Sequence, residues 1–266
     1  MVVVMHCDSM EVYMKQNKLD TGNEQQIKPY KRDAEYSYTL GAFPTYELIQ
    51  AKPGQIRKVL VASSFTDLDK LNKVCEENKI PLEVNDKLIA KISDKENCYV
   101  AGVFNKYNSV LQANRPHIVL VNPSNMGNLG TILRTAVGFG IYDVAIILPA
   151  ADLFNPKTVR SSMGALFKLN ICQYQTFEDY RNQFTKHELF TFMLDGENTL
   201  ELQNCPKTKL YSLVFGNEAT GLNSSYLEVG TSIFIPQSLD VDSLNLTIAV
   251  GIGAYVFTTV NSNRED

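Results

Sequence analysis

The sequence contains no tryptophan, three histidines and five cysteines among its 266 residues. The cysteines are odd in number, widely spaced and without a CxxC pair: Cys7, Cys75, Cys98, Cys172 and Cys205. Such spacing argues against a disulfide framework and against a zinc site. It is typical of proteins in a reducing compartment, so we expect a cytoplasmic protein without a bound metal.

Long apolar runs are also missing. Val2–Met5 is apolar, but it is too short for the core of a secretion signal and no basic segment precedes it. Residues 243–263 carry no charge, yet polar side chains interrupt them. They fall short of the roughly 20 predominantly apolar residues of a membrane span. We therefore expect a buried helix there and no membrane association.

Excess positive charge, which is typical of nucleic-acid-binding proteins, is absent as well, because the formal net charge is −4. Residues 1–116 carry 16 lysines and arginines against 15 acidic residues, whereas residues 117–266 carry 9 against 14. An RNA partner would therefore have to bind a local patch, mostly in the N-terminal half. Charge alone leaves the class of partner open.

Hydrophobic residues make up 44% of the chain, and its length favours two domains. Residues 1–35 are polar and irregular, and we interpret them as an N-terminal extension with one edge strand near Val2–Met5. Residues 36–105 alternate short strands and helices, which predicts a small α/β/α domain. Residues 106–116 form a polar linker that ends in Pro116. Residues 117–266 alternate apolar strands and helices, which predicts a mostly parallel sheet covered on both faces.

Hydrophobic periodicity places the individual elements. In the small domain we expect strands over 58–62, 81–84 and 99–104, and helices over 45–51, 66–79 and 86–92. We expect Asp86 to be the N-cap of the last of these helices. In the second domain we expect strands over 117–121, 144–148, 189–194, 211–215 and 232–235, and helices over 129–139, 157–166, 177–184 and 224–229. A final uncharged helix follows Ser243, its expected N-cap, with Asn245 in the first turn.

Ligands of open α/β sheets bind in the loops after the strands. Three such loops are rich in glycine, asparagine or serine: Asn122–Gly140, Leu213–Leu222 and Ile235–Phe257. Neither a P-loop, GxxxxGK(S/T), nor a GxGxxG dinucleotide fingerprint is present. The three histidines (His6, His117 and His187) lie outside these loops, so we expect each to be structural or exposed rather than catalytic.

Taken in order, the three loops resemble the three motifs of the SpoU/TrmH family of RNA ribose methyltransferases. The first is Asn128-Leu-Gly-Thr-Ile-Leu-Arg134, the second is Gly216-Asn-Glu-Ala-Thr-Gly221, and the third is Ile235-Pro followed by Ser243-Leu-Asn245. The stretch VRSSMGALFKL, residues 159–169, resembles a connecting segment of the same family. Ala219 stands where a glycine is common, and Gln237 where a methionine is common. The resemblance covers residues 117–260.

This resemblance implies a C-terminal SPOUT domain whose parallel sheet contains a deep trefoil knot, and a homodimer. Residues 36–105 resemble, more loosely, the ribosomal-protein-like RNA-binding domain of several family members, chiefly through LGAFPTYELI. The implied activity is S-adenosylmethionine-dependent methylation of a ribose 2′-hydroxyl in structured RNA, with 23S ribosomal RNA favoured and tRNA as the alternative. A catalytically inactive RNA-binding module, or a methyltransferase for a small molecule or a protein, is a further alternative.

The resemblance also assigns the site residues. It implies that Val214, Gly216, Asn217, Ile235 and Leu244 bind S-adenosylmethionine, largely through backbone groups. It implies catalytic roles for Arg134, Asn128, Glu218, Ser243 and Asn245, and none for a metal. A guanidinium with a pKa above about 12 is a poor base at pH 7. We therefore expect Arg134 to stabilise the developing alkoxide electrostatically, while the other four orient the ribose or the loops.

Overall fold

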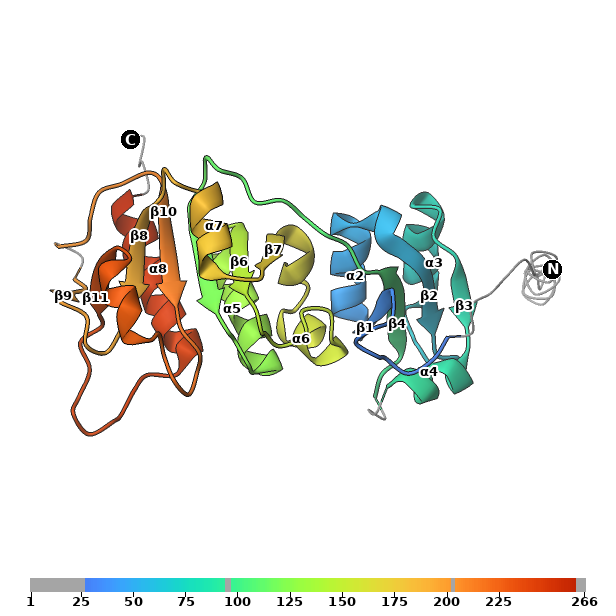
Figure 1. Cartoon of the computed structure of the whole chain (residues 1–266). Helices are drawn as coiled ribbons and strands as arrows, with labels where there is room; N and C mark the ends of the chain where they lie inside the picture. The colour runs from blue at the N-terminus through green and yellow to red at the C-terminus, as the bar shows by residue number, and fades with distance from the viewer. Residues whose placement is uncertain (1–26, 94–96, 202–203, 262–266) are drawn as a thin grey trace, which may run out of the picture.

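The computed structural model describes residues 27–93, 97–201 and 204–261. The edge strand expected near Val2–Met5 lies outside these residues. In the described part the chain forms two sheets, and the segment 106–116 runs from the small sheet to the large one. The small sheet lies at one end of an elongated molecule, and the C-terminal strands and the last helix lie at the other (Figure 1).

The small sheet has the order β1-β4-β2-β3. Its strands are β1 (Tyr36–Leu40), β2 (Ile56–Val61), β3 (Leu82–Val84) and β4 (Val100–Asn105). Strand β4 pairs antiparallel with both β1 and β2, and β2 pairs parallel with β3. The connecting helices are α2 (Ala42–Ala51), the short 3₁₀ helix η1 (Pro53–Gln55), α3 (Leu68–Glu77) and α4 (Asp86–Ile92).

Alternation along β2 explains the layers of this unit, because successive side chains of a strand point to opposite faces. Val59 and Val61 pack in one apolar cluster with Leu71 of α3. Leu60 packs in another with Ile89 of α4. The α/β/α arrangement expected from the sequence is therefore present, although β1 was not predicted. The predicted N-cap Asp86 is wrong, because the side chain of Asn85 accepts the capping hydrogen bond from Leu88 N at 3.0 Å.

In the described residues the large sheet has seven strands in the order β7-β6-β5-β10-β8-β11-β9, and every pairing is parallel. The strands are β5 (His117–Val121), β6 (Asp143–Ile147), β7 (Asn170–Tyr174), β8 (Glu188–Phe192), β9 (Asn198–Thr199), β10 (Tyr211–Phe215) and β11 (Thr231–Phe234). The parallel sheet expected from the sequence is thus confirmed, while β7 and β9 were not predicted.

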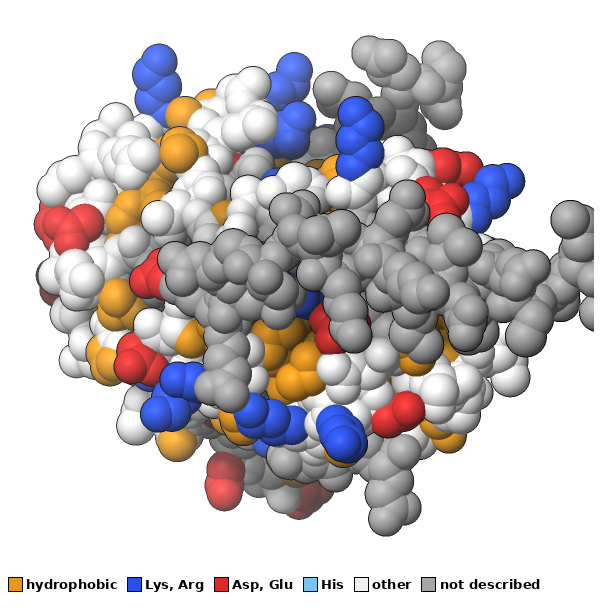
Figure 2. All heavy atoms as spheres, turned by 90° about the vertical axis from the view of Figure 1, so that its right-hand side faces the viewer, with side chains coloured by type: hydrophobic (Ala, Val, Ile, Leu, Met, Phe, Trp, Pro, Cys, Tyr) orange, Lys and Arg blue, Asp and Glu red, His pale blue; other side chains and the backbone are white. Residues whose placement is uncertain are grey.

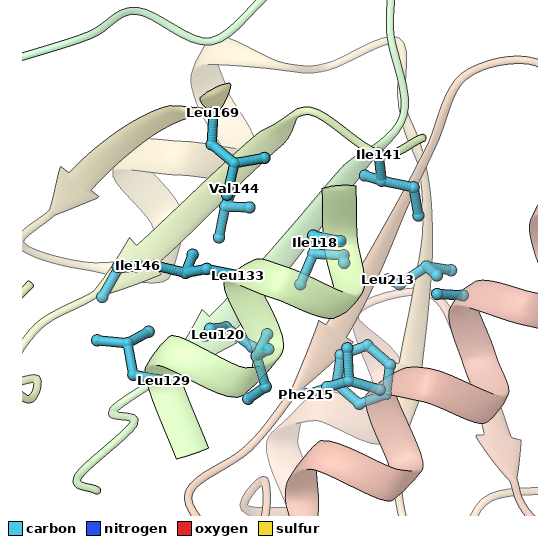
Figure 3. Packing of buried hydrophobic residues seen from close by; sticks show 14 of the residues in the cluster. Ile118, Leu120, Leu129, Leu133, Ile141, Val144, Ile146, Leu169, Leu213 and Phe215 are labelled. Carbon is cyan, nitrogen blue, oxygen red and sulfur yellow. The ribbon is translucent and has the colours of Figure 1, made fainter. Parts of the chain in front are cut away.

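Helices cover both faces of this sheet. On one face lie α5 (Met126–Gly138), α6 (Pro156–Ser161), the 3₁₀ helix η2 (Ala165–Lys168) and α8 (Leu246–Asn261). On the other lie α7 (Phe177–Gln183) and the 3₁₀ helix η3 (Ser224–Glu228). Figure 3 shows Leu129 and Leu133 of α5 over Ile118 and Leu120 of β5. Both faces of the strands are buried, which is why they read as continuous apolar runs.

Three predicted helices differ from the structure. The helix expected over 157–166 ends at Ser161, because Met163 and Gly164 adopt φ values of 49° and 81°, which no α-helix accommodates. The segment expected to be helical over 224–229 is a 3₁₀ helix. Ser243 is not the N-cap of the last helix: α8 begins at Leu246, and the Asn245 side chain accepts a hydrogen bond from Thr247 N at 2.8 Å.

The two sheets share an apolar core. Leu48 of α2 and Phe104 of β4 belong to the same buried cluster as Leu166 and Phe167 of η2. The rings of Phe104 and Phe167 meet edge to face, with centroids 5.3 Å apart. Lys168 and Glu47 add an ion pair of 2.5 Å across the boundary. The small unit is thus packed against the large one and not merely tethered to it.

The two described histidines lie together at the amino end of the large sheet. His117 is fully buried, and its ring lies 4.3 Å from the ring of His187. His117 Nδ1 hydrogen-bonds to Tyr180 at 2.9 Å, and His187 Nδ1 to Ser212 at 2.9 Å. A structural role, as expected, fits this placement. His6 lies outside the described residues.

Among the described residues, no group of histidine, cysteine or acidic side chains could hold a metal, and no helix is long and apolar enough to cross a membrane. Cys75, Cys98, Cys172 and Cys205 are all free thiols, whereas Cys7 lies outside the described part.

Candidate functional site

The loops that follow β5 and β10 are held together by one carboxylate. Glu218 accepts hydrogen bonds from Ser124 N at 2.9 Å, Ser124 Oγ at 2.8 Å and Asn125 N at 3.1 Å. Asn128 Nδ2 is a further donor at 3.4 Å. Burial raises the pKa of Glu218, but the hydrogen bonds from Ser124 and Asn125 outweigh burial and leave the pKa below its ordinary value. Glu218 is therefore an anion that fastens the first motif to the second.

The first motif begins with a capped helix. The Asn125 side chain accepts from Gly127 N at 2.8 Å and from Asn128 N at 3.1 Å, which fixes the start of α5. Asn128 is in the first turn and faces Glu218. At 100° per residue, Arg134 lies about 120° around the helix from Asn128, so the two side chains occupy different faces. Arg134 is exposed, and within the described parts of the chain it makes no ion pair and no side-chain hydrogen bond.

The second motif is a tight turn that depends on two glycines. A Cβ at Gly216 would lie 2.2 to 2.5 Å from backbone atoms of Gly221 and Leu222, so only glycine fits. Gly221 has a φ of 66°, in the left-handed region. Asn217 closes the turn, because its backbone N–H donates to Gly221 O and its Oδ1 accepts from Ala219 N at 2.8 Å. Asn217 Nδ2 also donates to Asn122 O at 2.7 Å.

A pocket of about 380 Å³ opens beside this turn, at the carboxyl ends of β8, β10 and β11. Its lining consists of residues 192–195, 215–222, 233–235 and 237, together with Ser243, Leu244, Leu246 and Ala249. The chain segments of the second and third motifs thus form its walls, as parallel strands that end at one edge of a sheet require. Its volume lies in the range of roughly 300–1,000 Å³ that is usual for small-molecule sites.

The structure brings six of the ten candidate residues to this pocket: Gly216, Asn217, Glu218, Ile235, Ser243 and Leu244. Val214 is elsewhere, because its side chain packs in the cluster on the α7 face of the sheet. Asn245 caps α8 outside the pocket lining, and Asn128 reaches the site only through Glu218. Arg134 lies on α5, which packs against α8, the helix whose first turn borders the pocket.

Sequence reasoning missed two parts of the site. The loop 193–195 after β8 forms one wall, yet its sequence, Met193-Leu-Asp195, contains no motif. The only available signal was its position after a buried strand. Ser124 and Asn125, the main partners of Glu218, were also missed, although Asn125 precedes a helix and could have been recognised as a cap.

The fold and the site together define an α/β protein that binds a small ligand at the carboxyl edge of a parallel sheet, with two glycine- or serine-containing loops around it. The model of the SpoU rRNA Methylase family matches residues 115–255. The chain therefore belongs to this family. The match includes all three sequence motifs and excludes the small sheet.

Similar proteins carry related names. An uncharacterized tRNA/rRNA methyltransferase of Synechocystis is 34% identical over 139 residues, which are 52% of this chain and 51% of that protein. The 23S rRNA (guanosine(2553)-2′-O)-methyltransferase RlmP of Bacillus subtilis is 29% identical over 130 residues, 48% of this chain and 52% of that protein. The match thus spans about half the length of these curated relatives.

Similarity to solved structures extends further along the chain. The AdoMet-bound rRNA methyltransferase of Sinorhizobium meliloti covers 85% of this chain, and 87% of that chain is matched, with 27% identity and a TM-score of 0.71. Since 85% exceeds the share of the large sheet, the likeness includes residues of the small unit. The α/β fold expected from the sequence is shared with these proteins.

Proposed function

We propose that this protein is an S-adenosylmethionine-dependent methyltransferase of RNA ribose 2′-hydroxyls, acting in the cytoplasm on large-subunit ribosomal RNA. The observation that carries the proposal is the Glu218 link, because it joins the loop lining the pocket to the start of the helix that bears Arg134. The Glu218 hydrogen bonds thereby fix the position of the pocket-lining loop relative to α5, the helix that bears Arg134. The names of the relatives given above support the choice of reaction.

The pocket fits S-adenosylmethionine by its geometry. A methyl group at Gly216 would collide with backbone atoms of Gly221 and Leu222, so the missing side chain lets the turn of the second motif close tightly beside the pocket. Backbone groups of 216–222 and 233–235 surround the space, and they can recognise an adenine edge and a ribose. Gly216, Asn217, Ile235 and Leu244 would hold the cofactor. When bound, the cofactor supplies an electrophilic methyl group.

The chain's own residues would act on the acceptor. The Arg134 guanidinium, which stays charged at pH 7, stabilises the oxyanion that develops on the ribose 2′-oxygen and contacts the neighbouring phosphate. Glu218 and Asn128 keep the first motif in place through the hydrogen bonds described above. Ser243 lies at the pocket and could orient the ribose, while Asn245 fixes the start of α8.

A homodimer would complete this site. Along α8, Ile248 is 53% exposed and Tyr255 is 48% exposed. The two residues are seven positions apart, so they lie on the same face of the helix. In the loop before α8, Leu239 and Val241 are exposed too. Apolar residues grouped beside a ligand pocket are typical of a protein interface. The deep trefoil knot remains part of the proposal, with residues 117–266 as the knotted domain.

Residues 36–105 would deliver the RNA. Figure 2 shows the end of the molecule formed by the small sheet, where lysine and arginine side chains lie along the upper and lower borders with acidic ones among them. Three basic residues of this unit, Lys52, Arg57 and Lys58, lie close together in the sequence and are partly engaged within the protein. Lys58 pairs with Glu83 at 3.1 Å, and Arg57 Nε donates to Asn105 Oδ1 at 2.5 Å. RNA contacts from this cluster would therefore come mainly from Lys52.

Transfer RNA is the second candidate substrate. A solved structure that concerns the 2-OH methylation of C/U34 on tRNA covers 57% of this chain, and 100% of that chain is matched, with 27% identity and a TM-score of 0.52. That structure matches only the length of the large sheet. The small sheet of this chain, packed onto the large one, favours the ribosomal substrate.

The test is methyl transfer from radiolabelled S-adenosylmethionine to unmodified 23S ribosomal RNA and to tRNA transcripts, followed by primer-extension mapping of the product. We expect a single 2′-O-methylated nucleotide in the ribosomal RNA. Methylation of tRNA alone would replace the ribosomal assignment. Cofactor binding without methyl transfer to any RNA would indicate a catalytically inactive binding module. Methyl transfer to a protein or a small molecule would indicate a different class of substrate.

A further inference from the structure

A second hollow, of about 610 Å³, lies at the same edge of the large sheet. Its walls include Tyr30, Arg32, Asn122, Ser124, Asp152 and Asn217. Its floor thus comes from the loops after β5 and β6, and Asn217 comes from the loop after β10. Asn217 belongs to the second motif, whereas Tyr30 and Arg32 belong to the N-terminal extension, to which the family resemblance assigns no role.

The two hollows are neighbours. The sheet order is β6-β5-β10-β8-β11, so the second hollow lies over the first three of these strands and the first pocket over the last three. Asn217 lines both. Ser124, in the second hollow, donates twice to Glu218, in the first. One extended ligand could therefore occupy both hollows by crossing the turn of the second motif.

Residues 27–35 build the outer wall by crossing from one sheet to the other. The Tyr30 hydroxyl donates to Asp152 Oδ2 at 2.5 Å, and Arg32 Nη2 donates to Ala150 O at 3.2 Å. Lys106 Nζ donates to Arg32 O at 2.7 Å and lies 4.8 Å from the centre of the Tyr30 ring. At its beginning the same segment is tied to the small sheet, because Tyr38 donates to Lys28 O.

This wall combines the groups that recognise one nucleotide. The Arg32 side chain is exposed and presents a planar cation, the geometry that suits a phosphate. Tyr30 supplies an aromatic ring of the kind that stacks on unpaired bases. The Asn122 side chain, whose Nδ2 donates to Pro149 O at 3.3 Å, presents its Oδ1 to a base edge. The acidic residue nearest to them, Asp152, already accepts hydrogen bonds from Tyr30 and from Phe154 N at 3.1 Å.

We propose that this second hollow binds a nucleotide of the RNA next to the one that is methylated, with Arg32 on its phosphate and Tyr30 against its base. The assignment rests on the proposed function and deepens it, because it gives residues 27–35 a role in substrate recognition. Proteins recognise unpaired loops of RNA whose bases are splayed out, so two neighbouring hollows suit two neighbouring nucleotides of such a loop.

The experiment measures RNA binding by the full chain at several salt concentrations, using an unmodified 23S ribosomal RNA transcript as probe. We compare the wild type with Arg32→Gln, Arg32→Lys and Tyr30→Ala. Arg115→Gln is the matched control, because Arg115 is an exposed arginine just before the amino end of β5. Both pockets lie at the opposite, carboxyl edge of the sheet. Thermal melting and S-adenosylmethionine binding are recorded for every variant.

We expect Arg32→Gln to weaken RNA binding about tenfold, the loss of one charge-assisted contact. The slope of log K against log salt should fall by about one, as when one phosphate contact is lost, and Arg32→Lys should restore it. Tyr30→Ala should weaken binding with an unchanged slope. Cofactor affinity of the Arg32 variants should equal that of the wild type, and their melting temperature should fall by a few degrees at most, because Arg32 is exposed and its hydrogen bond to Ala150 O lies at the surface.

Photo-cross-linking of 4-thiouridine-substituted RNA should place an adduct on residues 29–32. Equal RNA affinity and salt slope for Arg32→Gln and Arg115→Gln would overturn the proposal, as would adducts that avoid this segment altogether. If Tyr30→Ala unfolds, Tyr30→Phe replaces it as the tyrosine variant. The comparison of the Arg32 variants with the wild type then still tests the proposal. Failure of the wild type to methylate any RNA would instead count against the proposed function, because that readout does not depend on Arg32.

Discussion

At the scale of single residues, Arg134 and Glu218 divide the work of the site. Glu218 is a fixed anion that accepts three hydrogen bonds from Ser124 and Asn125, in the loop after β5, and one from Asn128 of the first motif, so it holds this loop and the start of α5 in place. Arg134 is an exposed cation on the same helix. A residue whose hydrogen-bond partners all lie within the protein serves to position other residues. A cation that faces solvent is available to a substrate.

Arg134→Ala should therefore abolish methyl transfer while cofactor affinity stays unchanged. Removing one donor that stabilises a developing oxyanion typically lowers the rate by ~10²–10³, or about 3–4 kcal/mol. The measurement is single-turnover transfer to ribosomal RNA alongside calorimetric cofactor binding, with Arg115→Ala as control. A variant that kept more than roughly a tenth of the wild-type rate, a loss under about 1.4 kcal/mol, would show that Arg134 has no such role.

Gly216 permits a second prediction, because its surroundings leave no space for a side chain. Gly216→Ala must displace backbone atoms of Gly221 and Leu222, which costs about 1–3 kcal/mol of unfolding free energy by overpacking. The turn moves with them, so S-adenosylmethionine binding should weaken by at least tenfold. Gly54→Ala is the control, since a Cβ there meets nothing within 4 Å. Denaturant unfolding and cofactor titration test both effects, and equal cofactor affinity of the two variants would contradict the assignment.

At the scale of elements, the amino ends of β5, β8 and β10 contain a buried polar cluster far from both pockets. His117 begins β5, His187 precedes β8, and Ser212 lies on β10. The pKa of His117 is lowered to about 4, mainly by burial and in part by the neighbouring His187, against the opposite effects of the hydrogen bond to Gln112 O and the charge of Asp143. Burial also lowers the pKa of His187.

This cluster makes stability depend on pH. In the unfolded chain a histidine takes up its proton near pH 6.5, whereas native His117 does so only near pH 4. The stabilisation is complete above about pH 6.5 and is lost as the pH falls from 6.5 towards 4, by up to about 3 kcal/mol for His117. Urea unfolding at pH 7 and pH 4.5 should show the loss, and His117→Gln should be less stable at pH 7 but lose less on acidification. A parallel pH profile of that variant would argue against the mechanism.

The strands of the large sheet could be predicted because both of their faces are buried, so β5 and β10 are uninterrupted apolar runs with sharp polar ends. Short edge elements could not be predicted. Strand β9 has two exposed residues, and β7 has only two buried ones, so pairing with a neighbour defines them and periodicity does not. The cap of α8 was misplaced by two residues because Ser243 and Asn245 are both good capping residues, and only the fold selects between them.

The residues of the candidate site also fall into those that could be predicted from the sequence and those that could not. Gly216, Ile235 and Leu244 could be placed because family motifs carry them, and the structure brings them to one pocket. Val214 could not be separated from them by sequence, since neighbouring residues of a strand alternate between faces and a motif gives no face. The contribution of Tyr30 and Arg32 could not be anticipated either, because it arises from a contact between residues more than a hundred positions apart.

At the scale of the whole molecule, the boundary between the two sheets is packed, while the α8 face is open. Phe104 and Phe167 close the boundary with an edge-to-face contact and full burial. A small unit fixed in this way, in the proposed role of RNA delivery, would present the RNA to the large one in a single orientation. The apolar side chains Ile248 and Tyr255 of α8, by contrast, face outward, Ile248 next to the pocket-lining Ala249 and Tyr255 further along the helix. The chain is therefore internally rigid and has one face that a second copy would cover.

We expect a homodimer through this face, and sedimentation at low micromolar concentration should give twice the 29.8 kDa mass of the chain. Ile248→Glu and Tyr255→Glu place charges in an apolar contact, which costs more than a dimer of ordinary area can tolerate. Both variants should sediment as monomers and lose methyl transfer, because the open side of the pocket is no longer covered. Val110→Glu is the control, since Val110 is 75% exposed but lies in the segment between the sheets. A wild-type monomer that transfers methyl groups at the full rate would rule out the shared site, and dimers of both glutamate variants would place the interface on another face.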